Sequence, residues 1–510
     1  MRFPRAGGVL LHPSSLPGPG GIGDLGPGAH RFVEFLERAG LSLWQVLPLG
    51  PAGPGASPYA SYSAFAGNPA LISLEHCVAQ GWLEPSDLGP LAELPEDLVD
   101  FDQVRITKDA LLRKAFHTFG DRATDAERAA FWAYCQDPLN ASWLEDYVLY
   151  MAIKKSQDDA PWFEWPSPLA RRDPQALQEV ASNLQDELWY HRFLQWLFDQ
   201  QWHALREHAH RHRVQIVGDV PIYVADDSAD VWSHPELFHL DDQGNRTVVA
   251  GVPPDYFSET GQLWGNPLYR WEVLEQTGFQ WWVERFRVTL DRVDRVRLDH
   301  FRGFEAYWEI PAGEETAVNG RWVPGPGHRL FHVLQQHLGT LPVIAEDLGV
   351  ITPQVETLRK DFGFPGMKVL QFAFGSGPEN AYLPHNYEKN CVVFTGTHDN
   401  DTTRGWFESA EPRVTAAVEA YLGPGSEPVV RRLVRLAMAS VADVCIVPMQ
   451  DFLELGTEAR MNIPGTKENN WRWRMAPDAA DRGLADRIRH LVTAYGRLPQ
   501  ETATRQESPA

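Results

Sequence analysis

Short apolar runs that end in polar residues recur along the chain, and helical patterns separate most of them. Eight such runs are candidate strands: 9–12, 43–47, 214–219, 293–299, 343–346, 367–374, 392–399 and 444–451. The spacing of apolar residues predicts helices in several of the remaining segments: 30–40, 279–290, 353–362, 429–439 and 481–495. Eight strands alternating with helices predict an α/β fold, a (β/α)8 TIM barrel. A doubly wound open sheet is the alternative, but the number of strands and the polar residues at their ends favour the barrel.

The chain is longer than a barrel requires, so large insertions between barrel strands are expected. A (β/α)8 barrel takes about 250 residues, whereas this chain has 510. We expect residues 1–57 to start a catalytic barrel, 58–205 to form a mainly helical insertion, and 206–500 to complete the barrel. A Pro/Gly-rich stretch at about 220–275 is typical of a lid-like insertion. Residues 501–510 are predicted to be a disordered tail.

Charge and composition exclude several classes of partner. The formal net charge is −22, so nucleic acid phosphates and an anionic membrane surface would both repel the protein. No apolar run approaches the ~20 residues that cross a bilayer, and the three apolar residues before His12 are too few for a signal-peptide core. The four Cys residues lack the spacing of zinc or redox motifs. We therefore expect a cytoplasmic protein with a neutral substrate, no nucleic acid partner and no membrane association.

Acidic residues follow four of the predicted strands. They are Asp219, Asp299, Glu346 and Asp399. An isolated acid at a strand end commonly caps the next helix, but the carboxyl ends of barrel strands meet at one face, where active sites lie. Clustered carboxylates fit either a metal site with oxygen ligands or glycoside chemistry. In glycoside chemistry one carboxylate attacks the anomeric carbon and a second, protonated one donates to the leaving oxygen.

Those two roles require opposite protonation states at the same pH. Arg297 lies two residues before Asp299, on the same face of the predicted strand, and its charge favours the ionised form of that carboxylate. Asp299 is therefore the candidate nucleophile. Glu346 is the candidate acid, because neighbouring carboxylates and a dry pocket would raise its pKa.

These motifs support a resemblance to a known family. Four segments resemble the successive signature regions of the α-amylase clan: 219–224, 297–300, 346–349 and 397–400. Further segments are closer to one branch of that clan: 12–17, 57–59, 63–69, 261–267 and 462–466. On this ordered set the chain resembles the amylomaltases, bacterial 4-α-glucanotransferases, from about residue 9 to about residue 475.

The resemblance implies a role for each matching residue. Asp299 would be the nucleophile, Glu346 the acid/base, and Asp399 would hold the hydroxyls of the donor sugar and favour its distortion. Four residues would bind sugar in the donor subsite: Tyr59, Asp219, Arg297 and His398. Three would come from the lid and line the acceptor side: Tyr256, Phe257 and Trp264. No metal or cofactor is implied.

The implied activity is retaining transfer of α-1,4-glucan segments to the 4-hydroxyl of an acceptor glucan or glucose, through a covalent glycosyl-enzyme. The partners would be maltooligosaccharides and α-1,4-glucans, and the protein a monomer or weak oligomer. An α-1,4-glucan hydrolase of the same clan is the main alternative. The pattern after Asp451 is Pro/Asn-rich and then helical, so no C-terminal β-sandwich domain is expected, which favours the transferase. A metal-dependent barrel hydrolase and a non-catalytic glycan-binding protein also remain open.

Two other features bear on possible sites. Related chains often have Gly-Tyr-Gly-Asp where this one has Gly53-Pro54-Gly55-Ala56. That tyrosine belongs in relatives to a second glucan site away from the cleft, so Pro54 and Ala56 argue against such a site at this position. Three histidines at 208, 210 and 212 lack the spacing of a metalloprotease motif and are interpreted as a solvated helix end.

Overall fold

The barrel strands follow from the apolar runs of the sequence. A computed structural model describes residues 2–53, 55–254, 258–466 and 468–499. Its eight parallel strands close in the order β1-β12-β11-β10-β9-β6-β3-β2. Their bounds are β1 (Ala6–Leu10), β2 (Leu43–Gln45), β3 (Gln215–Val220), β6 (Arg295–Leu298), β9 (Val343–Ala345), β10 (Gly366–Val369), β11 (Cys391–Phe394) and β12 (Val444–Pro448). The (β/α)8 barrel is thus confirmed, and each predicted run overlaps one strand.

The bounds of the first strand were predicted poorly. It was expected at 9–12 and lies at 6–10, because the apolar pattern passes over the glycines at its start. A Cβ on Gly8 would lie 2.7 Å from the Cβ of Leu43 on the neighbouring strand. Glycine therefore allows β1 and β2 to approach closely at this point.

Both faces of the barrel strands are buried, as expected for parallel strands covered by helices. In β1, Leu10 packs inside the barrel with Val217 and Ile344, whereas Val9 packs outward into the larger core beneath the helices. The barrel interior is therefore a packed apolar plug, and the polar residues that follow the strands are left at one end of it.

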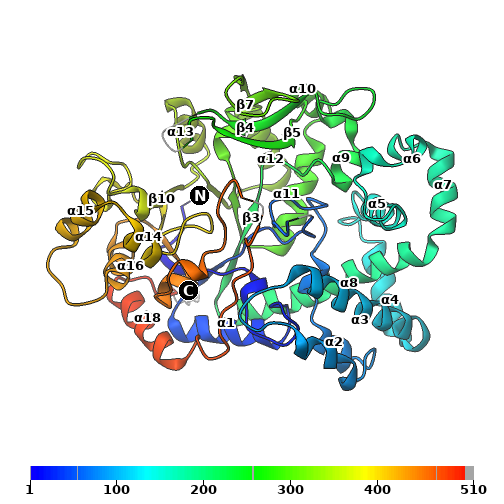
Figure 1. The fold of residues 1–510 in the computed structure, drawn as a ribbon, viewed down its shortest axis with the longest axis horizontal. Coiled ribbons are helices and arrows are strands. Elements are labelled where there is room, and N and C mark those ends of the chain that lie inside the picture. Colours follow the sequence, from blue (N-terminus) through cyan, green and yellow to red (C-terminus); the bar gives the residue numbers. More distant parts are fainter. Residues whose placement is uncertain (1, 54, 255–257, 467, 500–510) are drawn as a thin grey trace, which may run out of the picture.

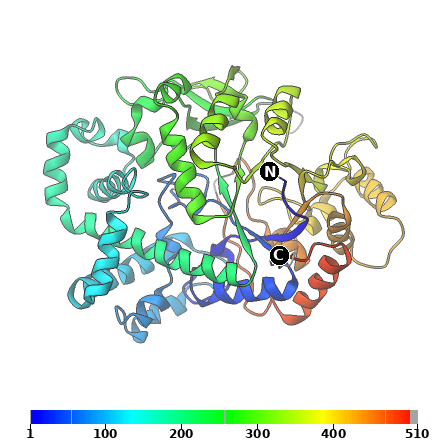
Figure 2. The same cartoon turned by 180° about the vertical axis from the view of Figure 1, so that it is seen from behind.

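Helices form a layer around the barrel (Figures 1 and 2). The outer layer contains α1 (Pro27–Ala39), α8 (Gln185–Arg211), α11 (Gln280–Arg292), α12 (His328–Leu338), α13 (Pro353–Asp361), α16 (Val429–Ala439) and α18 (Arg482–Ala494). The five helices expected from apolar spacing are all present. Between β11 and β12 the chain also forms α14 (Thr403–Ser409) and α15 (Pro412–Leu422).

The segment between β2 and β3 is mainly helical where it is described, and its helices lie to one side of the barrel, on the right in Figure 1. It contains α2 (Leu74–Ala79), α3 (Phe101–Arg122), α4 (Asp125–Cys135), α5 (Leu144–Ser156), α6 (Ser167–Ala170) and α7 (Pro174–Asn183). The long helix α8 joins this group to the barrel, since Phe193 and Trp196 pack against Phe119 while Trp202 donates to the carbonyl of Arg292.

A second sheet lies at the top of the view in Figure 1. Its antiparallel order is β5-β4-β7-β8. The range expected to form a lid contains α9 (Ala229–Ser233), β4 (Val248–Val252), β5 (Gln262–Pro267) and α10 (Trp271–Gln276). The other two strands, β7 (Ala306–Pro311) and β8 (Arg321–Pro324), follow β6 in the chain. Segments on either side of β6 therefore combine into one sheet.

The chain after β12 forms α17 (Met449–Phe452), a 3-10 turn and α18 in its described part, up to residue 499. It contributes no strand to a sheet there, in agreement with the expected lack of a C-terminal β-sandwich. Among the described helices, none combines the length and the apolar character needed to cross a membrane. Four sequence-based expectations fall outside the described residues, namely those for Pro54, Tyr256, Phe257 and the 501–510 tail.

Candidate active site

A single buried guanidinium joins two strand-end carboxylates. Arg297 lies on β6 opposite Asp219 on β3, in the parallel register of the two strands. Its Nη1 donates to Oδ1 and Oδ2 of Asp219 at 2.8 and 2.7 Å, and its Nη2 lies 2.8 Å from Oδ1 of Asp299. The pattern of the sequence brought Arg297 and Asp299 to one face of a strand, and the barrel adds Asp219 from the next strand.

Two neighbouring carboxylates keep the Arg297 guanidinium positively charged. Burial by itself lowers the pKa of Arg297, but Asp219 and Asp299 raise it well above its ordinary value. The guanidinium is therefore a permanent cation. Its second nitrogen faces Asp299, so a positive charge lies directly beside the candidate nucleophile.

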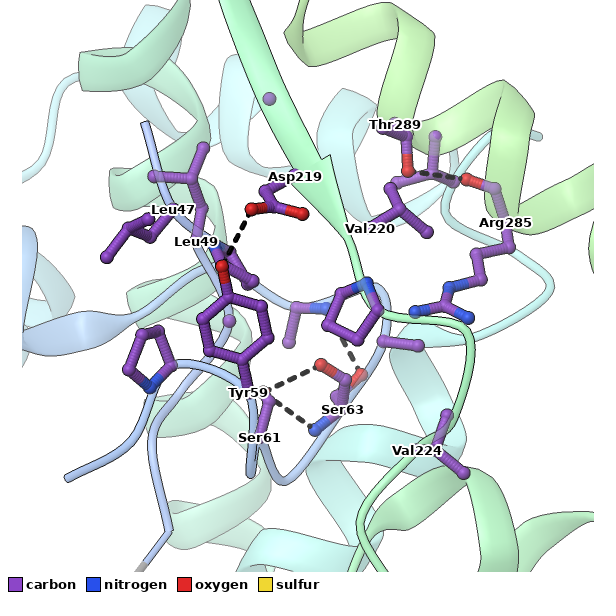
Figure 3. A pocket seen from close by; sticks show the side chains of 18 of the residues that line it. Leu47, Leu49, Tyr59, Ser61, Ser63, Asp219, Val220, Val224, Arg285 and Thr289 are labelled. Atoms are coloured by element: carbon purple, nitrogen blue, oxygen red, sulfur yellow. Dashed lines mark hydrogen bonds between the residues drawn. The ribbon is translucent and has the colours of Figure 1, made fainter. Parts of the chain in front are cut away.

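Tyr59 and His398 form one wall of this group. The Tyr59 hydroxyl points at Asp219 and donates to its Oδ2 at 2.7 Å (Figure 3). Burial raises the pKa of Tyr59 well above its ordinary value, so the hydroxyl keeps its proton. The Tyr59 ring stacks on His398, with centroids 5.0 Å apart and planes 18° apart. Two segments far apart in sequence thus present their rings side by side at the end of the barrel.

Glu346 occupies a different environment, just beyond β9. Its Oε2 accepts from the backbone N–H of His300 at 2.8 Å, and its Oε1 accepts from that of Leu348 at 2.8 Å. Burial, and secondly the charge of Asp299, raise its pKa to about 7. Near neutral pH, Glu346 therefore exchanges a proton readily, as a general acid/base must.

Asp399 follows β11 and is held from one side. Its Oδ1 accepts from Asn462 Nδ2 at 2.7 Å and lies 3.4 Å from His398 Nε2. Arg460 donates to the backbone carbonyls of both Asp399 and Asn462, at 2.9 and 2.8 Å. The Asp399 side chain is 46% exposed, so part of the carboxylate is open to a ligand.

Trp264 is brought close to the residue that follows the candidate nucleophile. Its ring lies edge-on to the His300 ring, with centroids 4.8 Å apart and planes 84° apart. His300 adopts a left-handed φ of 48°, and burial lowers its pKa to about 4, so the ring is neutral at neutral pH. The strand β5 thereby places an aromatic ring over the end of β6. Of the three aromatic residues expected from the lid, Tyr256 and Phe257 lie outside the described residues.

The sequence reasoning assigned no role to three residues that the structure places here. Asn462 fixes Asp399, as described above. Trp471 lies 5.9 Å from Tyr59 and 5.8 Å from His398, measured between ring centroids. His12 is buried at the end of β1, and burial, assisted by His398, lowers its pKa to about 3. Asn462 and His12 lie in segments that carried the family resemblance, and that signal could have identified them.

The described residues contain one three-residue grouping with metal-compatible spacing, and it lies away from these acids. Asp199 and His203 come from α8, and Asp291 from α11. The imidazole lies between the two carboxylates, with Nε2 3.0 Å from Asp291 and Nδ1 3.4 Å from Asp199. Hydrogen bonds to both acids raise the pKa of His203 to about 10. This arrangement is that of a protonated histidine bridging two helices.

The three histidines at the end of α8 and just after it do not point toward one common site. His210 Nε2 lies 2.9 Å from Asp294, and His212 Nδ1 lies 2.7 Å from Glu37. His208 packs its ring against those of His30 and His212. His210 and His212 thus face different carboxylates, and His208 contacts rings only, which agrees with a partly solvated helix end.

Comparison with known proteins decides the family. The sequence model of the family described as 4-alpha-glucanotransferase matches residues 11–480. The chain belongs to this 4-alpha-glucanotransferase family. A 4-alpha-glucanotransferase of Thermus thermophilus is 52% identical over 506 residues, covering 98% of this chain and 100% of that protein. A chloroplastic/amyloplastic 4-alpha-glucanotransferase of Solanum tuberosum is 46% identical, covering 97% of this chain and 87% of that protein.

Solved structures agree with this family. The amylomaltase from Streptococcus agalactiae in complex with acarbose superposes with a TM-score of 0.93 at 37% identity, covering 97% of this chain and 99% of that one. The amylomaltase from Corynebacterium glutamicum, at 20% identity and a TM-score of 0.77, shares the fold. The resemblance to amylomaltases is confirmed. The activity of the protein is 4-α-glucan transfer, as in its family.

Proposed function

We propose that Asp299, Glu346 and Asp399 carry out glucan transfer by a retaining double displacement. The observation that carries the proposal is the contrast between two acids. Asp299 is paired with the permanent cation Arg297, whereas Glu346 has a pKa raised to about 7. A carboxylate nucleophile and a protonated acid are the two groups that retaining glycoside chemistry needs.

In the first step, an oxygen of Asp299 attacks the anomeric carbon of the donor glucan. The bond from that carbon to the glycosidic oxygen breaks, and Glu346 gives its proton to the departing oxygen. This leaves a β-linked glycosyl ester on Asp299 and a carboxylate on Glu346. In the second step, Glu346 takes the proton of the acceptor 4-hydroxyl, whose oxygen attacks the same carbon and frees Asp299. Two inversions restore the α-1,4 linkage.

The other predicted residues would bind and orient the donor sugar. The exposed part of Asp399 would accept hydroxyls of the donor and favour its distortion. Tyr59, Asp219, Arg297 and His398 would line the donor subsite, since they form one hydrogen-bonded and stacked group. Trp264 would line the acceptor side together with Tyr256 and Phe257, and this lid would exclude water so that the intermediate waits for a sugar hydroxyl.

The substrates proposed are maltooligosaccharides and α-1,4-glucans, handled without a metal or cofactor by a monomer or weak oligomer. The four cysteines are free thiols, which supports the proposal that the protein works in the reducing cytoplasm.

The mechanism is tested by trapping the intermediate. Maltotriosyl fluoride would be incubated with the Glu346→Gln variant, because fluoride leaves without acid assistance while the second step lacks its base. We expect a maltotriosyl adduct on the peptide that contains Asp299, detected by mass spectrometry. An adduct on another residue, or the same adduct with the Asp299→Asn variant, would refute the assignment.

Hydrolysis is measured with the unmodified protein, maltotriose and no added metal. Transfer produces glucose and a ladder of longer oligosaccharides while the number of reducing ends stays constant. A rise in reducing ends with only shorter products would support the α-1,4-glucan hydrolase alternative and contradict the proposed role of the lid.

A further inference from the structure

A cavity of about 300 Å³ lies outside the group of catalytic acids. It is open to solvent on one side and is bordered by the second sheet, by the 3-10 turn that carries Phe163 in the helical insertion, and by the loop after β7. Asp226 and Arg246 line it, and Leu263 of β5 contributes to its wall. None of the acids that the mechanism uses borders this cavity.

The alternation of side chains along β5 places the cavity on the outer face of the sheet. Leu263 and Trp264 are consecutive, so they point to opposite faces. Trp264 faces His300 at the catalytic end of the barrel, whereas Leu263 lines the cavity. On the adjacent strand β4, Val249 also lines the cavity, and the next residue, Ala250, is buried in the main core. The strand β5 therefore lies between His300, which follows Asp299 in the chain, and the cavity.

The polar atoms of the cavity are incompletely paired. Arg246 Nε lies 3.0 Å from Oδ2 of Asp226, and its Nη1 donates to the carbonyl of Gly265. The other oxygen of this carboxylate, Oδ1, is buried and accepts no hydrogen bond within the described part of the chain. A buried carboxylate oxygen without a donor is costly. This oxygen is nearly inaccessible to solvent, so a ligand hydroxyl would meet it only after a shift of the Asp226 side chain, which Arg246 holds at the other oxygen.

The exposed apolar groups fit the ring faces of a sugar. Phe163 is 37% exposed and Leu263 is 38% exposed, and both line the cavity. The volume is at the lower end of the range of about 300–1,000 Å³ found for small-molecule sites. Asp226 and Glu314 give the lining a net negative charge against one Arg246, which disfavours an anion. A neutral ligand with hydroxyls and apolar C–H faces is the best match.

We propose that this outer cavity is a second glucan site, which binds a glucosyl unit of an α-1,4-glucan. The choice of ligand rests on the activity of the family, and the position differs from the loop at residues 53–56, where the sequence argues against such a site. A long glucan held there would raise the local concentration of chain near the catalytic acids. The site would therefore lower the KM for polymers and leave the KM for short oligosaccharides unchanged.

Binding is tested first, with maltoheptaose and the Glu346→Gln protein in titration calorimetry. We expect two sites, and we expect Phe163→Ala on that background to lose one of them. Trp132→Ala is the matched control, because Trp132 is an exposed aromatic residue of the same insertion, 46% exposed, that does not line the cavity. A single site in all three proteins would overturn the proposal. No binding by Glu346→Gln would also overturn the proposal, and it would contradict substrate binding at the proposed catalytic groove as well.

Kinetics provide the second test, in the active protein. Phe163→Ala should raise the KM for amylose about threefold to tenfold, the range expected for one lost ring contact. Its kcat, and its KM for maltotriose, should equal those of the parent and of Trp132→Ala. An unchanged KM for amylose would overturn the proposal. Equal thermal unfolding midpoints of the two variants would confirm that both are folded.

Discussion

The ends of β6 and β9 carry acids of the same chemical type in opposite environments. Asp299, after β6, faces the guanidinium of Arg297 at 2.8 Å. Glu346, after β9, is held by two backbone N–H groups, and burial together with Asp299 raises its pKa to about 7. The comparison shows that two acids on neighbouring strands differ in their partners, a guanidinium for Asp299 and two backbone N–H groups for Glu346. Adjacent strands of one barrel thereby provide the two environments that the proposed mechanism requires.

The most severe change removes the nucleophile. Asp299→Asn should lower kcat for maltotriose disproportionation by about 10⁴-fold or more, since the amide cannot form the glycosyl ester. The rate would be measured as glucose release. The pairing of Arg297 with Asp219 remains in this variant, so the protein should fold and bind maltooligosaccharides. A loss below tenfold would contradict the proposed role of Asp299.

The proposed acid/base role of Glu346 is tested with the Glu346→Gln variant. Its kcat should fall by about 10²- to 10⁴-fold, the range of general acid–base catalysis. In the parent protein, kcat/KM should decrease as the pH rises through about 7, because Glu346 then loses the proton that it must donate. With maltotriosyl fluoride, release of fluoride should lose this pH dependence. A flat pH profile with maltotriose between pH 6 and 8 would contradict the assignment.

Replacing the arginine should make the two environments more alike. Arg297→Lys keeps one charge but cannot bind two carboxylates with one planar fork. We expect kcat to fall about 10²-fold or more, with a smaller change in the KM for maltotriose. Lys and Arg differ little in size, so an unfolded variant is not expected, and thermal denaturation checks this. Activity within threefold of the parent would show that the fork is dispensable.

The smallest effect is expected at Asn462, which holds Asp399. Asn462→Ala removes the 2.7 Å hydrogen bond to this carboxylate and should lower kcat about tenfold. The effect on KM should be smaller, because the proposed role of Asp399 is to favour the distorted sugar. Asn462→Asp should be worse, since it places two carboxylates together. If kcat falls equally in Asn462→Ala and Asn462→Asp, while kcat/KM for maltotriosyl fluoride stays unchanged, the role of Asn462 is purely structural.

Local patterns predicted the barrel well and its elaborations poorly. Apolar runs located all eight strands, because parallel strands are buried on both faces and leave a continuous signal. The second sheet was missed. Its strand β5 has an exposed and partly polar sequence, and β4 finds its partner β7 only after the chain has passed through β6. Such pairing depends on contacts distant in sequence, which periodicity cannot reveal.

The candidate site was likewise predictable only in part. The amino-acid sequence alone determined the four strand-end acids, the arginine on the same face as Asp299, and the family. Only the tertiary structure brought Asp219 to the same guanidinium, stacked Tyr59 on His398, and tied Asp399 to Asn462. The reason is physical. Strand alternation sets which residues share a face. The register between strands and the approach of distant loops decide which charged side chains pair and which hydrogen bonds form.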